Sequence, residues 1–116
     1  MIIIIGILAA IAIPVFLNQR ASAAKASLTS DARNGAIAIE TFFTETQAYP
    51  ADLAAVEALD PLPPLSENNE IGDYAVVGGT AFTYCVEANA GAATGWSVTY
   101  DSAQQGTQDP VEALCP

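Results

Sequence analysis

The hydrophobic and polar positions of this chain fall into three successive patterns, and the first is a purely apolar run. From Ile2 to Leu17, 16 consecutive residues carry no charged or hydrogen-bonding side chain. A helix of this length spans about 24 Å, somewhat less than the roughly 30 Å hydrocarbon core of a bilayer. In water the run forfeits on the order of 10–20 kcal/mol of burial. It must therefore be covered, either by lipid or by the same segment of other copies.

The second pattern continues the same helix with apolar positions three or four residues apart. This spacing of one helix face persists over residues 17–43, with mostly polar residues between. Pro50 should end the helix, because the residue before a proline avoids helical backbone. Pro14 removes a backbone donor and should bend the helix, and Gly35 allows a second local bend. We therefore expect one helix over about residues 2–46, bent at Pro14.

In the third pattern the period changes to two. Aromatic and β-branched residues alternate with smaller or polar ones over residues 74–76, 82–86 and 96–100. Gly78-Gly79 marks a tight turn between the first two runs. The pattern predicts an antiparallel meander of three to four strands, with its aromatic face packed on the C-terminal half of the long helix. The expected fold class is α+β.

Charge is distributed unevenly along the chain. The net charge is −10, the only cations are Arg20, Lys25 and Arg33, and all 13 acidic residues lie at or after Asp31. We expect two parts, an apolar segment at 1–17 and a part at 18–116 made of the amphipathic helix continuation and an acidic head. Such a head repels nucleic acid, so we expect no direct binding to it. Between copies, the cations could pair with Asp31, Glu40 or Glu45, each exposed pair contributing about 0–1 kcal/mol.

Chemistry-bearing residues are sparse. The chain has no histidine, phosphate-binding loop or nucleophile elbow, so we expect neither an enzyme nor a cofactor. Cys85 and Cys115 favour a disulfide, because zinc requires three or four nitrogen or sulfur ligands. Cys85 alternates to the outer side of the predicted sheet, so the pairing would bring the C-terminal tail over that side. A calcium site at Asp101, Asp109 and Glu112 is the alternative, but without Asp-x-Asp spacing a solvated acidic loop is the better interpretation.

A cleavable secretory signal is an alternative interpretation of the apolar run. Ala21-Ser22-Ala23 offers a small-x-small cleavage site after it. However, no lysine or arginine precedes the run, and Arg20 stands between the run and this site. The helical pattern also continues through the site, so we favour a retained helix.

The segment Gly6-Ile-Leu-Ala-Ala-Ile-Ala-Ile-Pro14, which continues as Val15-Phe16-Leu17-Asn18-Gln19-Arg20, resembles the N-terminal helix of type IV pilins and pseudopilins. The resemblance extends to about residue 45, whereas the head resembles the family only in its plan of a helix, a small sheet and a C-terminal cysteine pair. It implies that these residues form the core of a filament: Ile2, Ile5, Gly6, Ile7, Leu8, Ile11, Ile13, Pro14, Phe16 and Leu17.

The family resemblance implies a structural filament subunit that acts in adhesion, motility or surface attachment. Such subunits are held in the cytoplasmic membrane, N-methylated and polymerised by pilus assembly machinery into an extracellular filament of identical copies at the bacterial surface. The first alternative is a pseudopilin of a type II secretion or DNA-uptake system. The second is a membrane-anchored or secreted binding module that does not polymerise.

One departure from the family pattern concerns the start of the sequence. The peptidase motif, the first mature aromatic residue and an early glutamate should precede Gly6 by several positions. Only Met1 to Ile5 stand there, and no acid occurs before Asp31. We therefore expect the sequence to be truncated at its start relative to the family.

Overall fold

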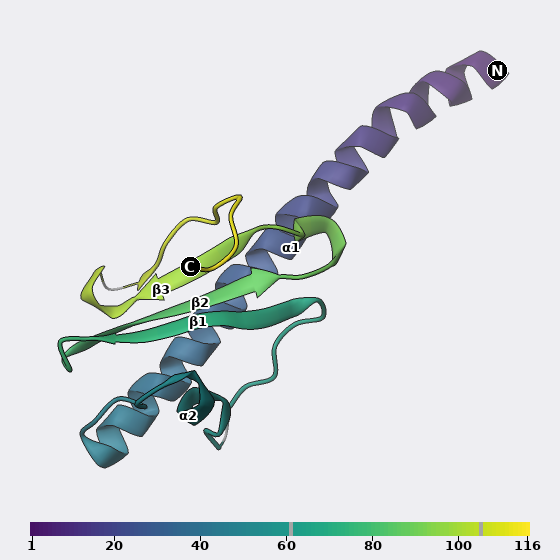
Figure 1. Cartoon of the computed structure of the whole chain (residues 1–116). Coiled ribbons are helices and arrows are strands. Elements are labelled where there is room, and N and C mark those ends of the chain that lie inside the picture. The colour runs from purple at the N-terminus through teal and green to yellow at the C-terminus, as the bar shows by residue number, and fades with distance from the viewer. Residues whose placement is uncertain (61, 105) are drawn as a thin grey trace.

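The structure is a computed structural model that describes residues 1–60, 62–104 and 106–116, with the side chains of these residues apart from 14–17. The predicted α+β class is confirmed: one long helix packs against a four-stranded antiparallel sheet (Figure 1). The elements are α1 (Ile2–Thr46), α2 (Leu53–Glu57), β1 (Asn69–Val77), β2 (Ala81–Ala88), the 3-10 helix η1 (Gly91–Ala93), β3 (Ser97–Asp101), the 3-10 helix η2 (Ser102–Gln104) and β4 (Gly106–Thr107).

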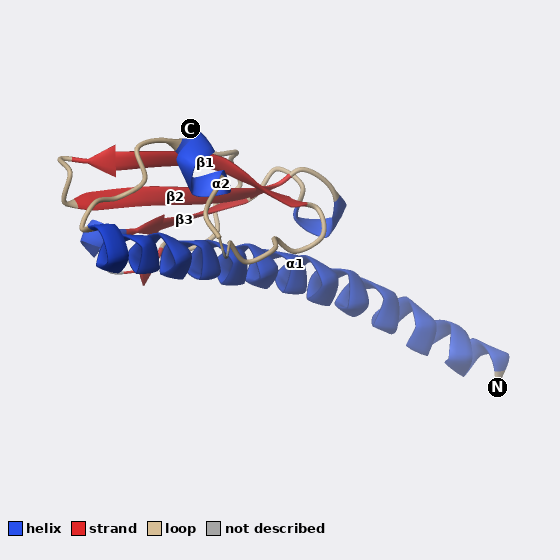
Figure 2. Cartoon of the chain, turned by 90° about the horizontal axis from the view of Figure 1, so that it is seen from below, coloured by secondary structure: helices blue, strands red, loops and turns tan. Residues whose placement is uncertain are grey.

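Helix α1 is continuous over 45 residues, with the bounds that the sequence predicts. It is slightly bent (Figure 2); the side chain of Pro14, to which the sequence analysis attributes a bend, lies outside the described residues. The helix ends at Gln47, whose backbone is left-handed with φ 60° and whose N–H donates to the Phe43 carbonyl. At about 1.5 Å per residue, α1 accounts for the longest dimension of the molecule, 67 Å.

The sheet is a meander of order β1-β2-β3-β4 that lies along the C-terminal half of α1 (Figures 1 and 2). The predicted turn between β1 and β2 is confirmed, because Gly78 and Gly79 both have positive φ values, 63° and 73°. Such a turn follows the twist of the strands that it joins. The two-residue strand β4 completes the sheet, within the predicted three to four strands.

The core lies between α1 and the inner face of the sheet, as the aromatic alternation predicts. The buried helix residues follow the predicted stripe, and the alternate strand residues face them. Tyr84, at the centre, pairs in register with Tyr74 on one side and Tyr100 on the other. The buried apolar residues are Leu28, Ala32, Ala36, Ile39, Val56, Tyr74, Phe82, Tyr84, Val86, Ala88, Ala93 and Val98.

Gly35 is the point of closest approach between α1 and the sheet. A Cβ atom built at Gly35 would overlap the ring of Tyr84. A glycine inside a helix costs about 1 kcal/mol relative to alanine, and here it makes room for an aromatic ring. From the sequence, Gly35 is a site where a local bend is possible, and its neighbours in the chain do not indicate its role in packing.

The predicted disulfide is present between Cys85 and Cys115, with their Cα atoms 5.9 Å apart. As expected, the C-terminal tail crosses the side of the sheet that faces away from α1 (Figure 2). Cys115 lies against Gly72, where a Cβ atom would overlap it, and its N–H donates to Glu87 Oε2 at 2.8 Å. The cross-link and this hydrogen bond hold the tail on the outer face.

Candidate assembly surface

The N-terminal part of α1 projects beyond the head, with no other element beside it (Figures 1 and 2). We refer to residues 1–17 as the apolar segment. Its described side chains are exposed on every side of the helix, from 57% at Ile7 to 98% at Met1. A helix that is apolar all round is normally buried. The exposed large side chains are Met1, Ile2, Ile3, Ile4, Ile5, Ile7, Leu8, Ile11 and Ile13.

This exposure is energetically comparable to the stability of a whole domain. Burying one isoleucine or leucine side chain contributes about 1.5–3 kcal/mol, so the isoleucines and leucine of the segment, at roughly two-thirds exposure, leave about 8–16 kcal/mol unrealised. Folded domains have net stabilities of about 5–15 kcal/mol. An isolated subunit with this segment in water is therefore energetically unfavourable, and the segment requires a partner that covers it.

The structure describes the side chains of only part of the predicted filament core. Ile2, Ile5, Ile7, Leu8, Ile11 and Ile13 are exposed, and a Cβ atom built at Gly6 would meet nothing within 4 Å. The side chains of Pro14, Phe16 and Leu17 lie outside the described residues. By length and composition α1 can cross a membrane, a property that it shares with signal sequences. The helix continues without interruption through the small-x-small site at 21–23 into the core of the head.

Beyond the apolar segment, a buried carboxylate ties α1 to the loop before β1. Asp31 is 5% exposed. Its Oδ2 accepts hydrogen bonds from the Ser66 N–H at 2.8 Å and from Asn69 Nδ2 at 2.7 Å, and its Oδ1 accepts one from Ser66 Oγ at 2.9 Å. Asn69 Nδ2 also donates to Ser27 Oγ at 3.0 Å. This network fixes the head to the helix that carries the apolar segment.

The expectation that Asp31 could pair with a cation of another copy is therefore wrong. Asp31 lies between Leu28 and Ala32 on the helix face that packs against the head, and its oxygens already accept three hydrogen bonds within the chain. A carboxylate removed from water in this way is stabilised by its donors. The sequence signal for this role is its place next to two residues of the buried stripe.

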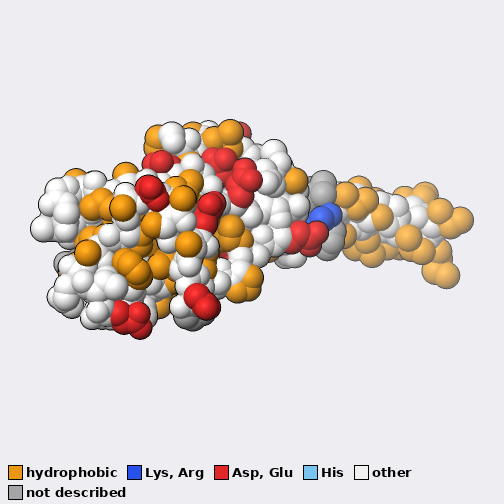
Figure 3. All heavy atoms as spheres, turned by 60° about the horizontal axis from the view of Figure 1, so that its bottom comes forward, with side chains coloured by type: hydrophobic (Ala, Val, Ile, Leu, Met, Phe, Trp, Pro, Cys, Tyr) orange, Lys and Arg blue, Asp and Glu red, His pale blue; other side chains and the backbone are white. Residues whose placement is uncertain are grey.

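Figure 3 shows basic side-chain atoms at the junction between the apolar segment and the head, with acidic ones directly beside them and further acidic side chains spread over the head. The Lys25 ammonium lies 3.6 Å from the centre of the Trp96 ring, a cation–π contact. Trp96 is half-buried against the core. Arg20 and Arg33 are exposed.

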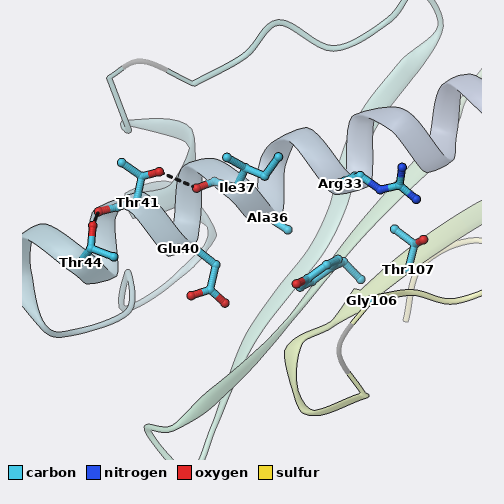
Figure 4. Close-up of a pocket in the computed structure, with 9 residues that line it drawn as sticks. Arg33, Ala36, Ile37, Glu40, Thr41, Thr44, Gly106 and Thr107 are labelled. Atoms are coloured by element: carbon cyan, nitrogen blue, oxygen red, sulfur yellow. Dashed lines mark hydrogen bonds between the residues drawn. The ribbon is translucent and has the colours of Figure 1, made fainter.

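A groove of about 580 Å³ runs between α1 and β4, further along the helix (Figure 4). Arg33 and Glu40 line it from α1, and Thr107 lines it from β4. The Thr41 hydroxyl at its edge donates to the Ile37 carbonyl at 2.8 Å. The groove thus presents one cation and one carboxylate, and it lacks the imidazole or thiol that would suggest acid–base or nucleophilic chemistry.

No group of three or more histidine, cysteine, aspartate or glutamate side chains within residues 1–60, 62–104 and 106–116 is arranged to hold a metal ion. Asp101, considered above as a calcium ligand, caps the 3-10 helix η2 instead. Its Oδ1 accepts the Ala103 N–H at 2.9 Å, and its Oδ2 accepts Gln104 Nε2 at 3.3 Å.

Two buried tyrosines carry the largest electrostatic perturbations in the head. Burial, with smaller contributions from the charges of Asp31 and Glu57, raises the pKa of Tyr84 to about 12. Burial also raises the pKa of Tyr74 to about 12, with a smaller contribution from Tyr49. The Tyr74 hydroxyl donates to the Pro50 carbonyl at 2.8 Å, so this phenol serves as a neutral hydrogen-bond donor within the head.

In comparisons with known proteins, no protein-family model and no curated protein matches this chain.

Proposed function

We propose that this protein is a structural subunit of a type IV pilin-like filament. The observation that carries the proposal is the apolar segment, whose described side chains are exposed on every side of the helix and which is continuous with the helix on which the head is built. In the proposed assembly, the apolar segments of identical copies cover one another in the centre of the filament, and the acidic heads face solvent. Before assembly, the segment lies in the cytoplasmic membrane.

Several features of the chain support the proposal that identical copies cover the apolar segment. The described side chains of the apolar segment make an apolar surface around the whole helix, so it can be surrounded by several similar helices at once. The segment carries no polar group that would select a different partner. Stacking one such chain by a repeated rotation and translation is the open symmetry that produces filaments.

The test is an aspartate substitution in the apolar segment of the full chain in its own cells. Ile11→Asp places a carboxylate where neighbouring helices would exclude water, which costs several kcal/mol for each subunit. Leu114→Asp is the matched control, because Leu114 is similarly exposed, 58% against 62% for Ile11, but lies in the tail of the head. We expect Ile11→Asp to abolish filaments that sediment and are visible by electron microscopy, and Leu114→Asp to retain them.

Formation of the Cys85–Cys115 disulfide in both variants would show that each head has folded. Intact filaments of Ile11→Asp would contradict the proposal. Detergent-solubilised wild-type protein that stays monomeric after detergent removal would favour a membrane-anchored binding module. Short fibres confined to the cell envelope, rather than long surface filaments, would indicate a pseudopilin.

A further inference from the structure

The end of the head nearest the apolar segment carries the ammonium group of Lys25, which forms no ion pair with a carboxylate of the described residues. Lys25 Nζ lies over the face of the Trp96 ring, 3.6 Å from its centre. Within the described part of the chain, this ring is the contact of the Lys25 ammonium. An ammonium group has three N–H donors, and a contact with a ring face leaves donors available for an anion.

The link that carries Trp96 is uncharged. Residues 89–96, between β2 and β3, contain no charged residue, and Ala90, Gly91 and Ala92 are exposed. These three residues border a shallow hollow of about 260 Å³ beside α1, with Glu67 on the same hollow. The next acids along the sheet are Glu70 and Glu87, which pair with each other in the β1–β2 register beside Ala88. The link itself therefore adds no charge that would repel an anionic surface.

The spacing along α1 places the pair close to a bilayer surface if the apolar segment lies in the membrane. Lys25 is eight residues beyond Leu17, which is about 12 Å of helix. The headgroup layer on each side of a bilayer is about 5–8 Å thick. The Cα–Cβ bonds of a helix are tilted toward its N-terminus, so the Cα–Cβ bond of Lys25 is tilted toward that layer.

The two residue types match the chemistry of the layer. Lysine keeps its carbon stem on apolar surface while its charge reaches polar groups. Tryptophan is enriched at membrane–water interfaces, because its ring is apolar and its N–H is polar. We propose that Lys25 and Trp96 dock the head on the phospholipid headgroup layer before assembly, with the Lys25 ammonium on lipid phosphate and the indole at the interface.

This docking requires the apolar segment to enter a membrane, and it does not require filament formation. Absence of filaments would therefore not contradict the proposed docking. Its consequence is a defined height of the head above the bilayer, with the link at 89–96 facing the lipid.

Trp96 is the only tryptophan of the chain, so its fluorescence reports the proposed contact directly. The full chain is reconstituted into vesicles of phosphatidylcholine and phosphatidylglycerol that carry a spin label on the headgroup or deep in the acyl chains. We expect strong quenching by the headgroup label, weak quenching by the deep label and partial protection from acrylamide in the water. Full acrylamide quenching without headgroup quenching would overturn the proposal, as would failure of the protein to float with the vesicles.

A pair of variants tests the part played by Lys25. Lys25→Gln removes the charge and should lower headgroup quenching of Trp96, whereas Arg33→Gln removes an equal charge about 12 Å further along α1 and should leave it unchanged. Circular dichroism and the disulfide verify that both variants fold. Headgroup quenching that is unchanged in Lys25→Gln would refute the role of Lys25.

Discussion

Replacing Asp31 tests whether the head is fixed to α1 by a buried carboxylate. Asp31→Ala removes the acceptor of three hydrogen bonds, two from Ser66 and one from Asn69. Hydrogen bonds to a charged acceptor contribute about 1.5–3 kcal/mol each, an upper total of about 4.5–9 kcal/mol. Ser66 and Asn69 are half-buried, so water can replace part of the loss. We expect a decrease of about 3–4 kcal/mol in the free energy of unfolding.

Asp31→Asn separates the shape of the side chain from its charge. The amide oxygen can accept the Ser66 N–H and Asn69 bonds in place of Oδ2, and the amide nitrogen can donate to the Ser66 hydroxyl in place of Oδ1. Only the charge assistance is lost, so we expect a cost of about 1–2 kcal/mol.

The assay is denaturant unfolding of the full chain in detergent micelles, followed by Trp96 fluorescence. Asp109→Ala is the control, because Asp109 is an exposed acid whose loss should change the free energy of unfolding by less than about 0.5 kcal/mol. Equal stability of Asp31→Ala and the wild type would refute the reasoning. Equal damage by Asn and Ala would show that charge, and not hydrogen-bond geometry, dominates.

Two further predictions concern the packing and the ionisation of the tyrosines. Gly35→Ala gains about 1 kcal/mol of helix propensity but forces Tyr84 to move, at a cost of about 1–3 kcal/mol, so the same unfolding assay should show net destabilisation. Gly6→Ala is the control, because a Cβ atom there meets no neighbour, and it should leave the stability of the head unchanged. A Gly35→Ala head as stable as the wild type would contradict the packing role. For Tyr74 and Tyr84, a folded-state pKa raised from 10.0 to about 12 means that their contribution to stability is complete below pH 10 and is lost as the pH rises toward 12. Circular dichroism across this range should show alkaline unfolding, shifted to higher pH in Tyr84→Phe, and an unshifted transition in that variant would count against the assignment.

The features that the sequence predicts well are those with a local period or a local steric rule. The stripe on α1, the alternation in the strands and the Gly78-Gly79 turn need only neighbouring residues for their interpretation, and each agrees with the structure. The disulfide is predictable because the chain has only one pair of cysteines.

The features that the sequence analysis missed depend on partners distant in the chain. Acidic residues are mostly exposed, so the place of Asp31 beside the buried stripe is a weak signal until its donors, 35 and 38 residues later, are known to meet it. Gly35 is ambiguous for the same reason, because the ring that fills its space belongs to β2. The contact of Lys25 with Trp96 likewise depends on where the link at 89–96 is placed against α1.

The continuity of α1 makes the molecule a lever. One helix joins the apolar segment to the head, and the Asp31 network prevents the head from sliding on it. The middle of the apolar segment and the middle of the helix–sheet contact are roughly 40 Å apart, so a tilt of about 5° at one end displaces the other by about 3–4 Å. A small change in the packing of the apolar helices would thus produce a much larger shift in the spacing of the heads.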